Sequence, residues 1–126
     1  LLLKGYNNIE VFNRSKKLIS FISLKKYTKK YSLIERHIIS ACLIINTTPT
    51  NPLNKKQLKL VGKKTILSDI VYKPAKTSFL KNFDGSKKIY GISMLIEQAI
   101  PCFNFWFGFN PKVDDQLLKK LSLKTK

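Results

Sequence analysis

Short apolar runs rich in β-branched residues alternate along this chain with stretches of helical periodicity. The clearest run is Cys-Leu-Ile-Ile at 42–45, which ends at Asn46, and another β-rich run covers 65–72. Continuous apolar runs of this kind are typical of strands that are buried on both faces. The alternation predicts an α/β fold with a parallel sheet, in which ligands bind beyond the carboxyl ends of the strands.

The remaining segments fit the same alternation. We expect a strand at 9–12, a helix at 16–26 with Ser15 as its N-cap, a short helix at 77–83, a brief strand at 88–90 and an apolar helix after it. The segment at 31–39 is ambiguous. No linker divides the 126 residues, so we expect one domain or a part of one.

The formal net charge of +17 raises nucleic acid or an anionic membrane surface as possible partners. Only Arg14 and Arg36 are arginines, however, and lysines are spread over nearly every segment rather than gathered in a patch. We therefore expect no nucleic-acid partner, and a small basic nucleic-acid-binding protein stays as the alternative. No run of about twenty uncharged apolar residues is present, so we expect no membrane span.

Groups suited to catalysis or metal binding are sparse. Cys42 and Cys102 lie far apart in apolar surroundings, which does not match metal-ligand spacing, and we expect buried, reduced thiols. His37 is the single histidine and has no nucleophile or ligand at a suitable spacing, so we expect a surface side chain. The sequence predicts neither a catalytic residue nor a metal site within this chain.

The residues after the first expected strand bear on cofactor choice. Asn13, Arg14 and Ser15 offer an amide, a guanidinium and a hydroxyl at the point where a dinucleotide-binding fold meets the adenosine ribose. An acidic residue there would accept the ribose hydroxyls of NAD, whereas Arg14 with nearby lysines suits the 2′-phosphate of NADP. The alternative is a solvated arginine at a helix start.

Polar residues also follow the next two strands. Asn46, Thr47 and Thr48 either hydrogen-bond a cofactor or close their strand through side-chain turns. Asp69 lies inside an apolar run, where a buried carboxylate needs a partner. Tyr72, near the end of the same run, either directs its hydroxyl into a cleft or packs with an exposed tip.

Two residues of the last apolar segment complete the set of candidates. Gly91 permits a tight turn, a positive φ or a close backbone approach to a ligand. Gln98 is an amide in an otherwise apolar row of the expected helix, and it reaches either a ligand or solvent.

Taken in order, these motifs resemble the C-terminal half of shikimate dehydrogenase: IEVFNRS, LIINTTP, DIVYKP and YGISMLIEQA, ending in FWFG. The resemblance implies an incomplete Rossmann-like parallel sheet with flanking helices, from which the first strand and the glycine-rich loop are missing. Residues 1–126 would then be the NADP-binding domain, truncated at its N-terminus, with a helical segment at about 92–122 completing the substrate cleft. The missing strand would lie between the strands at Ile9 and Leu43.

The resemblance also implies roles for individual residues. The cofactor-binding residues would be Asn13, Arg14, Ser15, Lys17, Thr48, Ile70, Gly91 and Met94, and the substrate-binding residues Tyr72 and Gln98. Ser93 and Leu18 depart from the family, which has a glycine and a basic residue at these positions.

The activity implied by the resemblance is the reversible, NADPH-dependent reduction of 3-dehydroshikimate to shikimate, a cytoplasmic step on the route to chorismate and the aromatic amino acids. The family's catalytic lysine and aspartate belong to the N-terminal domain, so we expect this chain alone to be inactive. The resemblance leaves open a homodimer of the whole enzyme and a relative that uses quinate with NAD.

Overall fold

The computed structural model describes residues 5, 6, 8–13 and 27–124. The described strands are β1 (Val11–Asn13), β2 (Thr28–Lys30), β3 (Leu43–Asn46), β4 (Ile66–Asp69) and β5 (Lys88–Ile89). The helices are a 3-10 turn, η3 (Tyr31–Leu33), followed by α1 (Ile34–Ile38), α2 (Lys55–Leu60), α3 (Ser78–Lys81), α4 (Gly91–Phe107) and α5 (Asp115–Lys124). Their alternation confirms the predicted α/β class.

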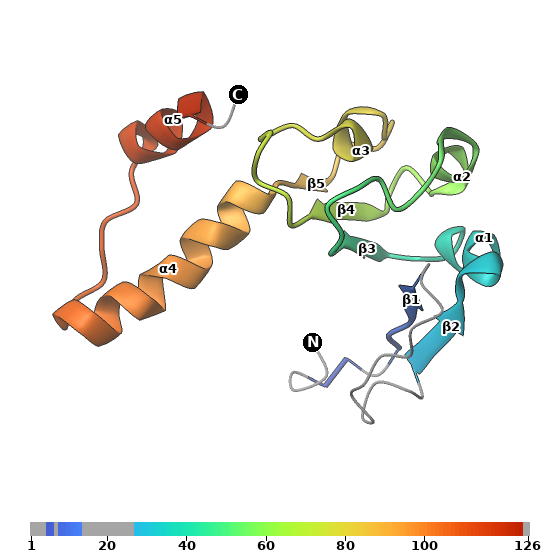
Figure 1. Ribbon diagram of the computed structural model, residues 1–126, viewed down its shortest axis with the longest axis horizontal. Coiled ribbons are helices and arrows are strands. Elements are labelled where there is room, and N and C mark those ends of the chain that lie inside the picture. The colour runs from blue at the N-terminus through green and yellow to red at the C-terminus, as the bar shows by residue number, and fades with distance from the viewer. Residues whose placement is uncertain (1–4, 7, 14–26, 125–126) are drawn as a thin grey trace.

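All strand pairs are parallel, and they form two separate sheets (Figure 1). One sheet has the order β1-β2 and the other the order β3-β4-β5. The usual doubly wound order is 3-2-1-4-5-6, into which the first sheet fits as the 3-2 pair and the second as 4-5-6. No strand of the described residues takes the position between β1 and β3, in agreement with the expected incomplete Rossmann-like sheet.

One face of the β3–β5 sheet carries the hydrophobic core. Helices α2 and α3 lie on the same side of this sheet (Figure 1), and Leu67 of β4 is fully buried beneath them. Phe79 and Leu80 of α3 are each 1% exposed, and Ile44 of β3 packs against the same cluster. Burial of these side chains is the main force that holds helices of only four to six residues on the sheet.

The prediction that β3 is buried on both faces is wrong. Leu43 is 38% exposed and Ile45 is 42% exposed, because among the described elements helices cover only the side to which Ile44 points and β4 is the one strand paired with β3. The prediction that the cysteines are buried is also wrong. Both Cys42, next to this strand, and Cys102, on α4, are free but exposed rather than buried.

The structure contains two elements that were not predicted from the sequence. The segment Thr-Lys-Lys forms β2, and the polar stretch after Asn54 forms α2. Helix α2 begins with a capping box, in which Asn54 accepts from the Gln57 amide while the Gln57 side chain accepts from the Asn54 amide. The helix expected at 16–26 lies outside the described residues.

Strand boundaries shift by a few residues from those expected. The first strand is Val11–Asn13, and the run at 65–72 forms a strand only over Ile66–Asp69, so Tyr72 follows the strand instead of ending it. The ambiguous segment becomes η3 and α1.

Helix α4 is the longest described helix, with 17 residues, and it continues through Pro101. It starts next to β5 and carries its C-terminal half away from the sheet (Figure 1), ending at Gly108 in the left-handed conformation with a φ of 76°. In the described part of the chain, we find no helix that combines the length and the apolar character needed to cross a bilayer.

Candidate functional site

Strands β3 and β4 end side by side at residues that are register partners. Asn46 closes β3 and Asp69 closes β4, and they are 2% and 1% exposed. Both side chains point to the covered face of the sheet, beside Thr77 at the start of α3. The parallel arrangement therefore brings two buried polar residues together at the carboxyl edge, where an α/β sheet binds its ligands.

Three donors hold the Asp69 carboxylate. Its Oδ1 accepts from Asn46 Nδ2 and from the Val71 backbone N–H, both at 3.1 Å, and its Oδ2 accepts from the Thr77 hydroxyl at 2.6 Å. A buried carboxylate is tolerated only when donors of this kind replace its water. The expectation that Asp69 has a partner is confirmed, and its contacts join the end of β4 to α3.

Asn46 holds the loop that follows β3. Its Oδ1 accepts from the Thr48 N–H at 3.0 Å and from the Thr48 hydroxyl at 2.8 Å, and its Nδ2 lies 3.1 Å from the Thr48 carbonyl. Of the two functions considered for these polar residues, closure of the strand by side-chain turns is present. The Thr48 hydroxyl is turned toward its own chain.

Gly91 packs against the backbone that follows β4. A Cβ at this position would lie 2.4 Å from the Ile70 carbonyl oxygen and 2.6 Å from that of Val71, so only glycine fits. Its φ is not positive, and the close approach is to its own chain. The turn from β5 into α4 is thereby fixed against the residue expected to meet the nicotinamide.

The remaining predicted residues are more dispersed. Asn13 ends β1 in the other sheet and is exposed, and Met94, on the first turn of α4, is half-buried. Tyr72 is 47% exposed and Gln98 is exposed on α4. Arg14, Ser15 and Lys17 lie outside the described residues, so the structure gives no geometry for the expected phosphate-binding segment.

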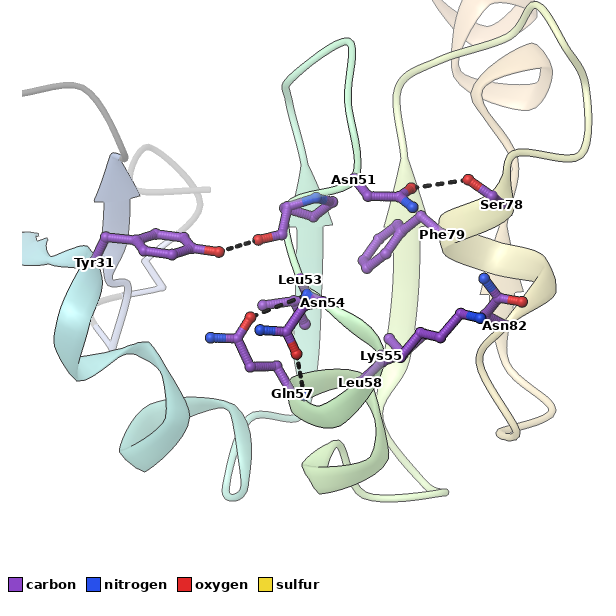
Figure 2. A pocket seen from close by; sticks show the side chains of 11 residues that line it. Tyr31, Asn51, Leu53, Asn54, Lys55, Gln57, Leu58, Ser78, Phe79 and Asn82 are labelled. Carbon is purple, nitrogen blue, oxygen red and sulfur yellow. Dashed lines mark hydrogen bonds between the residues drawn. The ribbon is translucent and has the colours of Figure 1, made fainter.

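A cavity of about 400 Å³ lies between Tyr31 and the starts of α2 and α3 (Figure 2). Its polar groups bond to one another: Asn51 accepts from Ser78 at 3.1 Å, and the Tyr31 hydroxyl donates to the Pro52 carbonyl. None of the predicted site residues lines it. We interpret it as packing between loops and not as the ligand site.

A second cavity of about 280 Å³ lies at the covered side of the strand ends. Asn46, Asp69 and Thr77 line it together with Lys73, but none of the residues to which the resemblance assigns a cofactor or substrate contact takes part. Sequence reasoning identified Asp69 but missed its link to Asn46 and Thr77. No three His, Cys, Asp or Glu side chains in the described ranges are grouped so that they could hold a metal ion.

His37 was expected to be a surface side chain, and the structure shows it only partly exposed. It is half-buried on α1, its Nδ1 lies 2.5 Å from Glu10 Oε2, and its ring centroid is 5.3 Å from that of Phe12. These contacts join α1 to β1, so His37 has a structural role.

Known proteins with similar sequences are shikimate dehydrogenases. The chain is 30% identical over 130 aligned residues to the NADP(+) shikimate dehydrogenase of Brucella abortus, covering 93% of this chain and 45% of that protein. It is 36% identical over 83 residues to the corresponding protein of Jannaschia sp., covering 61% of this chain. The chain thus spans about 45% of the length of the first of these relatives. No family model matches the sequence.

Solved structures agree in fold. Shikimate 5-dehydrogenase from Thermus thermophilus, solved with NADP(H) and shikimate, has a TM-score of 0.72 at 22% identity, covering 99% of this chain and 49% of its own. Shikimate dehydrogenase from Aquifex aeolicus has a TM-score of 0.64 at 26% identity, covering 87% of this chain and 42% of its own. Quinate dehydrogenase from Corynebacterium glutamicum, solved with NAD, has a TM-score of 0.63 at 24% identity, covering 77% of this chain and 36% of its own. The resemblance stated from the motifs is confirmed.

Proposed function

We propose that this chain, a relative of the shikimate dehydrogenases, is the NADP-binding half of an enzyme that reversibly reduces 3-dehydroshikimate to shikimate. The observation that carries the proposal is the adjacent ends of β3, β4 and β5, which Thr48, Ile70 and Gly91 follow in the sequence and where Gly91 packs on Ile70. The chain that carries them matches the Brucella abortus enzyme over 93% of its length. By this proposal the chain belongs to a cytoplasmic enzyme of aromatic amino acid biosynthesis and is inactive alone.

The strand ends are compatible with an anionic cofactor. Asp69, the carboxylate at the ends of β3–β5, is 1% exposed and accepts hydrogen bonds from three donors, so its oxygens are not presented on the surface of the strand ends. Thr48, Ile70, Gly91 and Met94 would border the nicotinamide, and Asn13, Arg14, Ser15 and Lys17 would hold the phosphate-bearing ribose. NADP supplies or accepts the hydride when it is bound, and the part of this chain is to bind and orient it.

The substrate contacts proposed for this chain come from two exposed side chains. The Tyr72 hydroxyl would donate to the substrate carboxylate, and the Gln98 amide would hydrogen-bond its hydroxyls. The family's N-terminal domain would face them and supply proton transfer. The far end of α4 supports such a shared cleft, because Phe105 and Trp106 are 84% and 72% exposed and large apolar side chains of this kind mark contact surfaces.

A chimeric enzyme tests the proposed function. This enzyme consists of the N-terminal portion of the Brucella abortus relative, followed by this chain in place of that protein's matched segment. We expect it to oxidise shikimate with NADP, and to do so with a higher kcat/KM than for shikimate with NAD or for quinate with either cofactor. A preference for quinate with NAD would favour the quinate-dehydrogenase alternative. The mass of the chimeric enzyme in solution would give its oligomeric state.

Arg14→Glu in the chimeric enzyme tests the phosphate-binding segment. A carboxylate would repel the 2′-phosphate and accept the ribose hydroxyls of NAD, so we expect the ratio of kcat/KM for NADP to that for NAD to fall by about a hundredfold. Arg36→Glu is the matched control, because Arg36 is an exposed arginine on α1. An unchanged ratio in the Arg14 variant would show that another residue holds the phosphate.

A further inference from the structure

The peptide unit that joins Ile70 to Val71 is held on both of its sides. Its N–H, on Val71, donates to Asp69 Oδ1 at 3.1 Å, which closes a side-chain turn directly after β4. Its C=O, on Ile70, lies against Gly91, where an added Cβ would be 2.4 Å from the carbonyl oxygen. The N–H and C=O of a planar trans peptide point in opposite directions, so the two contacts together fix how this plane is rotated.

The carboxylate that holds this peptide is itself oriented by α3. Its Oδ2 accepts from the hydroxyl of Thr77, the N-cap residue of α3, at 2.6 Å. Thr77 is 8% exposed and Asp69 is 1% exposed, so water does not compete for this short, charge-assisted bond. One oxygen of Asp69 is thus anchored by Thr77 while the other meets the Val71 N–H, and the position of the second depends on the first.

The peptide after Ile70 is the place where the nicotinamide is expected to lie, under the function proposed above. Hydride transfer is sensitive to geometry, because a displacement of about 1 Å in a reacting group can lower a rate by about a hundredfold. Asp69 is too deeply buried to act on the cofactor directly. Its effect on the reaction must pass through the backbone that it holds.

We propose that Asp69 and Thr77 are a positioning pair for hydride transfer, an inference that rests on the proposed function. Thr77 fixes the Asp69 carboxylate, and the carboxylate fixes the Ile70–Val71 peptide against which the nicotinamide lies. Neither member of the pair is a catalytic residue. The pair contributes to kcat more than to cofactor affinity, because the residues assigned to the phosphate-bearing ribose follow β1 in the other sheet.

Substitutions at Thr77 in the chimeric enzyme test the effect on catalysis. Thr77→Val removes the hydroxyl that anchors Asp69, and we expect kcat for shikimate oxidation to fall by about tenfold while the KM for NADP changes by less than about twofold. Thr77→Ser keeps the hydroxyl and should retain the parent kcat. Ser78→Ala is the matched control, because the neighbouring Ser78 hydroxyl donates to Asn51, at 3.1 Å, and not to Asp69.

Hydrogen exchange in this chain alone separates positioning from general stability. Thr77→Val also removes the cap of α3, since the Thr77 hydroxyl accepts from the Leu80 N–H, and this loss lowers stability throughout. We expect the Val71 amide to exchange about tenfold faster in Thr77→Val than in Thr77→Ser. The Ile66 amide, bonded to the Cys42 carbonyl at the other end of the β3–β4 pair, should change less. A purely structural role would accelerate both amides equally.

Three results would overturn the positioning pair. One is an equal kcat for Thr77→Val and Ser78→Ala in an active chimeric enzyme. Another is a KM for NADP that rises as much as kcat falls, since the pair would then serve cofactor binding. The third is equal acceleration of the Val71 and Ile66 amides. A parent chimeric enzyme without turnover would instead overturn the proposed function, and the exchange measurement, which needs neither cofactor nor substrate, would still decide whether Thr77 controls the peptide.

Discussion

Replacing Gly91 with alanine is expected to lower the free energy of unfolding by about 3 kcal/mol, because it overpacks a place where two backbone segments touch. The added Cβ would lie within 2.4 to 2.6 Å of the Ile70 and Val71 carbonyl groups. No flexible side chain is present to give way, so either α4 or the segment after β4 must move. The same movement would displace the backbone proposed to meet the nicotinamide.

The measurement for Gly91→Ala is urea unfolding of the chain in dilute solution, followed by the far-ultraviolet circular dichroism of its helices. Gly62→Ala is the matched control, because the nearest atom to its added Cβ is the Thr65 hydroxyl at 3.4 Å, an ordinary contact. We expect this control to stay within about 0.5 kcal/mol of the parent. Equal midpoints for the two variants would mean that the Gly91 contact does not hold the turn.

A second large effect is expected for Asp69→Ala, which should lower the free energy of unfolding by about 3 kcal/mol or more. The substitution leaves the Val71 N–H and the Thr77 hydroxyl without their acceptor, and it removes one of the three acceptors around the Asn46 amide. Each buried donor that loses its partner costs about 1–3 kcal/mol. The loops after β3 and β4 both depend on these contacts, so we expect the substitution to loosen both loops.

Asp69→Asn is the matched variant for this network. Its amide oxygen keeps the acceptor for Asn46 and Val71, and its new amide group can donate to the Thr77 hydroxyl oxygen. We expect a cost of about 1 kcal/mol, measured in the same urea titration. If Asp69→Asn were as damaging as Asp69→Ala, charge and not hydrogen-bond geometry would be the property that position 69 requires.

The elements that sequence reasoning located are those with strong local signals. Strands β3 and β4 come from apolar runs, β5 is the short segment just before Gly91, and α4 begins at that glycine with a long apolar stretch after it. Strand β2 was missed because Thr-Lys-Lys has no apolar alternation and is held by pairing with β1. Helix α2 was missed because its Asn54 and Gln57 capping box lies in a polar segment that reads as a loop.

Burial and side-chain partners could not be predicted in the same way. Leu43 and Ile45 belong to an apolar run typical of a buried strand, yet their exposure depends on whether a neighbouring strand and helix are present. The site was predictable as far as parallel strands end at one edge, which brings Ile70 and Gly91 together. The bonds from Asp69 to Asn46 and Thr77 depend on strand register, which no local pattern specifies.

We propose that this chain is the cofactor-side half of a shikimate dehydrogenase site whose other half would lie in the family's N-terminal domain. The most direct test is the rate of NADP reduction with shikimate, measured for this chain alone, for the N-terminal portion of the Brucella abortus relative alone, and for the chimeric enzyme. We predict turnover for the chimeric enzyme and none for either part. A folded chimeric enzyme without turnover, or turnover by this chain alone, would contradict it.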